Sequence, residues 1–271
     1  TGTIGGGKTN NPEGNIGHAT IDISGGDISA QFVMAGGAGD GMITTFNMSG
    51  GTISNSDVIN KEYYHIKNNG AAVYMEDGVF TMTAGTIRNC VANMGGAVYI
   101  KKSENALRDP EFVMQGGSIE DCRSSSHGGA VYLEGGSVVL SGGVIHGNLA
   151  SNGNGGGIYV TSSTSEVDVE VYSGSILNNT SDNNGGGICV DMSGNDSVAN
   201  VVVGSAGSTS VDNPDISNNA AVMYGGGLYA IGENAKVTIN GGCIIDNTVV
   251  NYVPNENVTN QRGTVVLNGG D

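Results

Sequence analysis

The sequence Gly95-Gly96-Ala97-Val98-Tyr99 is one copy of a five-residue motif that returns along most of the chain. The other copies keep its glycines, its apolar fourth residue and its aromatic fifth residue, with small changes. They are Gly70–Tyr74, Gly128–Tyr132, Gly155–Tyr159, Gly185–Cys189 and Gly225–Tyr229, and successive fifth residues lie 25, 33, 27, 30 and 40 residues apart. A short motif repeated at such intervals indicates stacked structural units rather than an ordinary globule.

A second motif lies between the copies of the first: an alternating strand, then small residues, then isoleucine. Phe80–Ile87 and Phe112–Ile119 are the clearest examples. Further copies end at Ile28, Ile53, Ile145, Ile176, Ile216 and Ile244, and a last copy begins at Leu267. A small residue follows the isoleucine three positions later, and we expect these residues to form a ladder: Ser56, Cys90, Cys122, Asn148, Asn179, Asn219 and Asn247.

Short alternating strands cannot bury an apolar face alone, but stacked coils cover one another and share one core. Glycine pairs supply the positive-φ or crowded corners between such strands. We therefore predict an all-β fold, a single-stranded right-handed parallel β-helix (solenoid) of roughly eight coils of 25–40 residues, about 40 Å long. Its inward residues should be Phe80, Met82, Ile87, Val98, Ile100, Val131, Leu133, Ile158, Val160, Val169, Val171, Val237 and Ile239.

The predicted domain organisation is one β-helix over residues 1–271, with degenerate N-terminal coils in 1–69 and regular repeats in 70–271. We interpret the chain as a fragment of a longer protein, because its last residues fall within a repeat. Its 26 acidic and 10 basic residues give a net charge of -16, which repels nucleic acid and anionic membranes. The sequence has no apolar run long enough for a membrane span and no signal peptide.

The two motifs resemble the G-G-A-[I/L/V] and F-x-x-N repeats of chlamydial polymorphic outer membrane proteins, which also occur in large surface proteins of gut Firmicutes and methanogens. The second signature has isoleucine in place of phenylalanine, as in Ile145–Asn148 and Ile176–Asn179. Cys90 and Cys122 stand where the second signature has asparagine, and both motifs are poorly matched before residue 70. The resemblance covers roughly residues 20 to 271. It implies a β-helix and, only as a class, adhesion at a bacterial or archaeal cell surface.

Alternation places the motif tyrosines on the outer side of the coil, where they would form an aromatic row interrupted at Cys189. The row is Tyr74, Tyr99, Tyr132, Tyr159 and Tyr229. Such a row could stack on sugar rings or pack against a partner chain. Alternatively, rings in register simply stabilise one another, each pair by about 0.5–1 kcal/mol. We favour the stabilising role and keep the row as the candidate ligand-binding surface.

Carboxylates on adjacent outer strands would indicate a carbohydrate-active enzyme, because glycoside hydrolysis needs two acids at a defined separation. The densest acidic strand, Glu166–Val171, does not meet this need, since Glu170 aligns with Val139 and Val202. The acidic loops could bind Ca²⁺ through Asp182, Asp191, Asp196, Asp212 and Asp215, but no calcium-loop pattern is present. We interpret both features as solvated acids and assign no catalytic residue, metal site or cofactor.

The remaining motifs carry less information. Gly2–Thr9 matches the phosphate-loop formula but has no strand before it and no helix after it, so we interpret the match as chance. Cys90 and Cys122 occupy equivalent places on adjacent coils, as stacked free thiols or as a disulfide; Cys189 and Cys243 have no partner. We expect His18, His65, His127 and His146 to be surface or corner residues.

The sequence favours a non-enzymatic, extracellular, adhesin-like module: a rigid acidic rod that binds host or microbial glycans or proteins, or acts as a spacer. We expect a monomer, with no nucleic-acid partner and no direct membrane contact. The alternative is a β-helix polysaccharide lyase or glycoside hydrolase.

Overall fold

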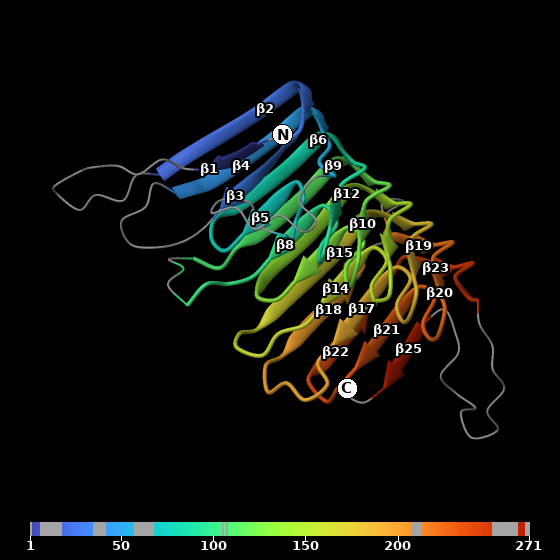
Figure 1. Ribbon diagram of the computed structural model, residues 1–271. Helices are drawn as coiled ribbons and strands as arrows, with labels where there is room; N and C mark the ends of the chain where they lie inside the picture. Colours follow the sequence, from blue (N-terminus) through green and yellow to red (C-terminus); the bar gives the residue numbers. More distant parts are fainter. Residues whose placement is uncertain are drawn as a thin grey trace.

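The computed structural model describes residues 2–5, 18–34, 42–56, 68–104, 106, 108–206, 213–250 and 265–268. Every regular element in these residues is a β-strand, and every strand pairing is parallel. The strands stack in chain order from β1 to β25, as the colours in Figure 1 show. None of the described residues form a helix that is long and apolar enough to cross a membrane.

Three parallel sheets make up the stack. Sheet A holds the six strands of the first motif, β5 (Val73–Met75), β8 (Val98–Ile100), β11 (Val131–Leu133), β14 (Ile158–Val160), β17 (Ile188–Asp191) and β21 (Leu228–Ile231), together with β1 (Gly2–Gly5), β3 (Ala30–Met34) and β25 (Val265–Asn268).

Sheet B holds the strands of the second motif: β2 (His18–Ile28), β4 (Met42–Ile53), β6 (Val79–Arg88), β9 (Glu111–Glu120), β12 (Gly136–His146), β15 (Val167–Leu177), β18 (Ala199–Val203) and β22 (Ala235–Ile239), joined by β19 (Asp215–Ser217) and β23 (Cys243–Ile245). Sheet C is formed by two-residue strands: β7 (Val91–Ala92), β10 (Arg123–Ser124), β13 (Leu149–Ala150), β16 (Thr180–Ser181), β20 (Ala220–Ala221) and β24 (Thr248–Val249).

From β5 onward the chain runs repeatedly through sheet A, then sheet B, then sheet C, which is the arrangement of a parallel β-solenoid. The core lies inside the coils and is built from columns of like residues. Phe46, Phe80 and Phe112 stack with ring centroids 4.6 and 4.8 Å apart, and Ile87, Ile119, Ile145 and Ile176 are fully buried. This in-register stacking confirms the expectation that each coil covers the apolar face of its neighbour.

Eleven of the thirteen predicted inward residues are fully buried, whereas the two on β22 are not. Val237 is partly buried against the core, and Ile239 is 47% exposed, so the prediction is wrong at Ile239. Among the described strands β22 pairs only with β18, so its core side chains have a neighbouring coil on one side only.

The last strand also departs from expectation. A copy of the second motif beginning at Leu267 predicts a strand that joins β22 in sheet B. Val265–Asn268 instead pairs with β21 in sheet A, Val265 opposite Leu228 and Leu267 opposite Ala230. Apolar alternation alone suits either sheet, so Val265–Asn268 do not identify their sheet from the sequence.

The glycines of the first motif lie, as expected, at corners with positive-φ or crowded backbone. The first glycine of each copy has a positive φ, between 57° at Gly95 and 69° at Gly155. The second has no room for a side chain: a Cβ on Gly129 would lie 2.1 Å from the carbonyl oxygen of Gly156 in the next coil. Backbone therefore packs directly on backbone at this corner wherever the second residue is glycine, whereas the copy at Gly70 has room for Ala71.

Candidate functional site

The predicted aromatic row exists as a continuous column on the outer side of sheet A. Tyr74, Tyr99 and Tyr132 stack with centroids 5.2 and 5.1 Å apart, and Tyr159 follows 5.2 Å from Tyr132. Cys189 interrupts the column as expected, and Tyr229 continues it. The column forms an apolar cluster separate from the interior core.

The tyrosines are, however, far more buried than an outward-facing row suggests, because each is only 5–8% exposed. Tyr99 and Tyr132 each lie between two other tyrosines in the register, and the partly buried Val33, Met94, Tyr224 and Ile231 pack against the column. His127 stacks on Tyr159 with centroids 4.5 Å apart. The ring faces are therefore occupied within the column, and what solvent can reach is the hydroxyl edge.

Carboxylates line that hydroxyl edge. The Tyr74 hydroxyl donates to Glu76 Oε1 at 2.7 Å, and the Tyr99 hydroxyl donates to Glu134 Oε2 at 2.9 Å. Burial, and then the nearby Glu134, raise the pKa of Tyr99 far above its ordinary value. These phenols therefore remain protonated donors at any physiological pH.

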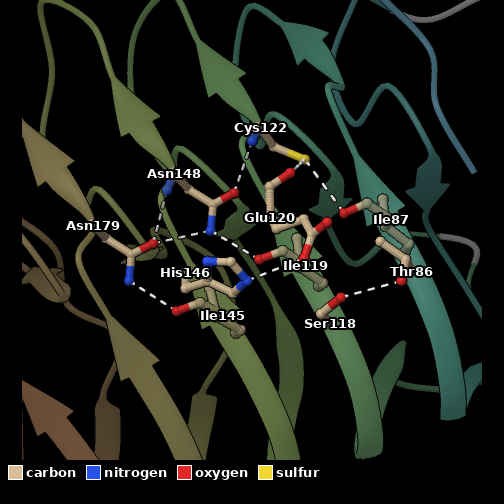
Figure 2. Close-up of polar contacts among 10 residues, drawn as sticks. All are labelled: Thr86, Ile87, Ser118, Ile119, Glu120, Cys122, Ile145, His146, Asn148 and Asn179. Atoms are coloured by element: carbon tan, nitrogen blue, oxygen red, sulfur yellow. Dashed lines mark hydrogen bonds and ion pairs between the residues drawn. The ribbon is translucent and has the colours of Figure 1, made fainter.

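A second column, shown in Figure 2, is the ladder of asparagines at the end of the sheet B strands. Asn148, Asn179 and Asn219 are at most 1% exposed. The backbone N–H of Asn148 donates to Asn179 Oδ1 at 3.0 Å, and that of Asn179 donates to Asn219 Oδ1 at 2.9 Å. Each side-chain amide also donates to the isoleucine carbonyl of the preceding coil, as Asn179 Nδ2 does to Ile145 at 2.9 Å. The ladder thus satisfies backbone groups that the corner would otherwise bury unpaired.

The ladder corrects the sequence prediction at one member. Ser56 is not in it; Asn55 is, because its carbonyl accepts the backbone N–H of Val91 as Cys90 accepts that of Arg123. In the other coils a residue of left-handed conformation precedes the ladder position, as Asn178 (φ 54°) precedes Asn179. This coil lacks that residue between Ile53 and the ladder, so the spacing is one residue shorter.

Cys90 and Cys122 occupy two successive rungs as buried free thiols, the first of the two alternatives. The Cys122 thiol lies 3.3 Å from the carbonyl oxygen of Glu120 and 3.8 Å from that of Ile87 (Figure 2). Burial, and then hydrogen bonding with Cys90, raise the pKa of Cys122 well above its ordinary value. The Cys122 thiol therefore takes the place of the asparagine donor toward the Ile87 carbonyl without becoming a reactive thiolate. Cys189 is buried in the tyrosine column and Cys243 is exposed.

On the outside of the same corner, Glu120 lies between Arg88 and His146 in the strand register. His146 Nε2 is 3.0 Å from Glu120 Oε2 (Figure 2), and Ser118 and Thr86 share a hydrogen bond of 3.2 Å. These side chains are partly exposed, and their contacts tie neighbouring coils together at the surface.

The acidic strand β15 lies as predicted. Glu170 pairs in register with Val139 on one side and Val202 on the other. Asn200 donates to Glu166 at 2.7 Å and to Asp168 at 2.9 Å, so these acids bind an amide rather than a second acid. Neither neighbour of Glu170 can therefore supply the second carboxylate of a hydrolytic pair.

The acids considered as possible Ca²⁺ ligands are scattered. Asp182 accepts the N–H of Asn152, Asp191 accepts from Tyr159, and Asp215 and Asp196 lie on other segments. Asp212 lies outside the described residues. Within the described ranges, no three His, Cys, Asp or Glu side chains gather closely enough to hold a metal ion. The phosphate-loop match is described only at Gly2–Gly5, which form strand β1.

Sequence reasoning missed a second, shorter ladder, at the residue before the first glycine in three consecutive copies of the first motif. The N–H of Asn184 donates to Asn154 Oδ1 at 3.0 Å, and that of Asn154 donates to His127 Nδ1 at 3.1 Å. His127 is therefore a half-buried acceptor and not a simple surface histidine. His65 and the side chain of His18 lie outside the described residues. Aligning the residue that precedes each glycine pair would have revealed this ladder.

Comparison with known proteins gives a match in one part of the chain. Residues 173–191 match the model of the Chlamydia polymorphic membrane protein (Chlamydia_PMP) repeat. This segment contains the fully buried Ile176, the rung Asn179 and the glycine corner before β17, so both signatures have a structural role. No curated protein and no solved structure gives a significant match. The chain therefore carries, at residues 173–191, a repeat similar to that of the Chlamydia polymorphic membrane proteins.

Proposed function

We propose that this chain is a rod-like, non-enzymatic module of a bacterial or archaeal surface protein, folded as a right-handed parallel β-helix of roughly eight coils. Right-handed crossovers are the strongly preferred connection between parallel strands, which supports the handedness. The similarity to a polymorphic membrane protein repeat supports a location at the cell surface. The adhesin-like role, binding of a glycan or protein outside the cell, is the finer part of the proposal.

The observation that carries the proposal is that both repeated columns are used for stacking. The asparagine ladder satisfies backbone groups in the interior, and the tyrosines fill a second apolar cluster. A chain whose repeated residues join each coil to the next forms a stiff rod in which each coil contacts only its neighbouring coils. Such a rod suits presentation of a binding surface away from the cell, or spacing of other domains.

The alternative function, a polysaccharide lyase or hydrolase, has less support. Catalysis of this kind needs two acids at a fixed separation across the outer face. The strongest acidic strand faces Val139 and Val202, and its other acids bind Asn200. The proposal includes no catalytic residue, no cofactor, no nucleic-acid or membrane contact, and a monomeric state.

The test is a binding array of host and microbial glycans and proteins probed with the whole chain, run beside assays for new reducing ends from pectin and alginate. We expect saturable binding to a restricted set of ligands and no release of reducing ends. Turnover of any polysaccharide would contradict the non-enzymatic role. Replacing Tyr99 and Tyr132 with phenylalanine keeps the column packed, so a loss of binding in this variant would place the ligand at the hydroxyl edge.

A further inference from the structure

A row of polar residues runs beside the tyrosine column, two positions after Tyr74, Tyr99, Tyr132, Tyr159 and Cys189; the same position after Tyr229 is Ile231. It reads Glu76, Lys101, Glu134, Thr161 and Asp191 in successive coils. The register is fixed by backbone bonds: the N–H of Lys101 donates to Met75, that of Glu134 to Ile100 and that of Thr161 to Leu133, each toward the preceding coil. Asp191 follows Thr161 because Val160 pairs with Val190.

One gap between carboxylates in this row already holds a cation. Lys101 lies between Glu76 and Glu134, and its Nζ is 3.1 Å from Glu134 Oε1. Its side chain is 46% exposed, so the ammonium group stays at the surface while neutralising the row. The next gap, between Glu134 and Asp191, is occupied by the uncharged Thr161, whose Oγ1 accepts from Asn195 Nδ2 at 3.3 Å.

The tyrosine beside this gap has an unused hydroxyl. Tyr99 donates to Glu134, and Tyr159 donates to Asp191 Oδ2 at 3.4 Å, in each case to the row residue of the following coil. The same direction from Tyr132 leads to Thr161. Among the described residues none forms a hydrogen bond with the Tyr132 hydroxyl, although Tyr132 is only 7% exposed. Glu134 and Asp191 both act electrostatically on this phenol.

We infer that the gap at Thr161 binds one cationic group, an ammonium or guanidinium, presented by a lysine or arginine of a basic partner protein. The carboxylates of Glu134 and Asp191 supply charge on either side, roughly 10 Å apart along the row. The Tyr132 oxygen accepts a hydrogen bond from the bound group. Lys101 shows the same recognition within the chain one gap away. The inference deepens the proposed surface role by naming the chemistry of a partner.

A bare metal ion suits this gap less well than an organic cation. Ca²⁺ takes six to eight oxygen ligands at about 2.3–2.6 Å, whereas the gap offers two separated carboxylates and two hydroxyls. Glu134 already binds Lys101 and Tyr99, and Asp191 also accepts from Ser193. A carboxylate has about four acceptor positions, so each retains capacity for a further donor. An anion would be repelled by both acids and by the net charge of -16.

The test follows the backbone amide signals of the whole chain by NMR during titration with a blocked Gly-Arg-Gly peptide at physiological salt. We expect saturable shifts centred on Tyr132, Thr161 and Asp191, and none with a blocked Gly-Gln-Gly peptide. Thr161→Lys places a cation in the gap and should weaken binding by about ten-fold or more, whereas Thr161→Asp adds charge and should tighten it. Tyr132→Phe should weaken binding without changing the fold.

The matched control is Thr238→Lys, which makes the same charge change at an exposed position of sheet B. It should alter the affinity by less than about two-fold, because a distant exposed charge is screened. Equal losses in the two lysine variants would mean general attraction to an acidic surface and would overturn the inference. Displacement of the peptide by Ca²⁺ at the same residues would also overturn it. If the Thr161→Lys variant still binds its ligands on the array of glycans and proteins, the proposed surface role stands and only this cation site is refuted.

Discussion

Replacing Asn179 with alanine should destabilise the rod more than any exposed asparagine does. Asn179 is fully buried, and its Oδ1 accepts the backbone N–H of Asn148 at 3.0 Å and the Asn148 side-chain amide at 2.9 Å. Its Nδ2 donates to the Ile145 carbonyl at 2.9 Å and to Asn219 Oδ1 at 3.0 Å. Alanine removes all of these bonds at once.

The expected loss in the free energy of unfolding depends on which polar groups lose their only described side-chain partner. Asn148 Nδ2 keeps the Ile119 carbonyl, and Asn219 Oδ1 keeps the backbone N–H of Asn179. The backbone N–H of Asn148 and the side-chain contact to the Ile145 carbonyl are lost. A buried polar group left unpaired costs about 1–3 kcal/mol, so we expect a loss of roughly 2–5 kcal/mol in the free energy of unfolding.

The assay is denaturant unfolding followed by circular dichroism, because the chain contains no tryptophan. The midpoint should fall with little change in the slope, and hydrogen exchange should rise first at the Asn148 amide. Asn179→Cys should lose less than alanine does, since cysteine already serves at Cys90 and Cys122. Asn240→Ala, at an exposed position, should stay within about 0.5 kcal/mol of the parent. If Asn179→Ala costs no more than Asn240→Ala, the ladder does not stabilise the fold.

Three further predictions concern other parts of the repeat. Gly129→Ala places a Cβ 2.1 Å from a backbone oxygen, so thermal unfolding should show a loss of roughly 1–3 kcal/mol or more; an unchanged melting temperature would contradict the backbone contact. Asn218→Val at φ 55° should cost about 1–2 kcal/mol while Asn218→Gly costs little, and equal midpoints would refute the left-handed requirement. Burial lowers the folded-state pKa of His127 below 6.5, although the charge of Asp191 acts in the opposite direction. Just below pH 6.5 the unfolded chain therefore binds more protons than the folded chain. Stability should therefore fall as pH drops through about 6.5 toward the folded-state pKa; His127→Asn, which copies Asn154, should flatten this dependence in urea unfolding, and an unchanged profile would exclude His127.

The parallel solenoid could be predicted from the sequence because every coil of a solenoid has the same structural requirements. The apolar alternation of Phe80–Ile87 and the glycines of Gly95–Tyr99 each recur, so a local pattern fixes sheets, corners and core columns together. The prediction was wrong where this redundancy ends: Ile239 lies in β22, which pairs with β18 alone among the described strands, and β25 lies in sheet A although its residues were assigned to the second motif.

The candidate site was harder to predict because alternation gives the side of a strand but not what covers that side. Tyr99 does point away from the interior core, yet it is 5% exposed because its neighbours in the column cover it. Its hydroxyl partner, Glu134, is 35 residues away in sequence, and no local pattern links the two. The ladder position of Asn55 was also missed, because a one-residue difference in a corner cannot be read from spacing alone.

Residues that build the rod are nearly the same in every coil, whereas residues that are free to recognise a partner vary from coil to coil. The ladder position is asparagine or cysteine and the outer column is tyrosine in nearly every coil, and both are buried. The position two residues after the tyrosine varies from Glu76 to Lys101, Glu134, Thr161 and Asp191, although its backbone is held in the same register. The side chains at this position are partly or fully exposed. Variation at a solvent-accessible and regularly spaced position is what a surface needs to acquire a specific charge pattern without disturbing the fold. Recognition by this rod should therefore follow the polar row beside the tyrosines and not the tyrosines themselves.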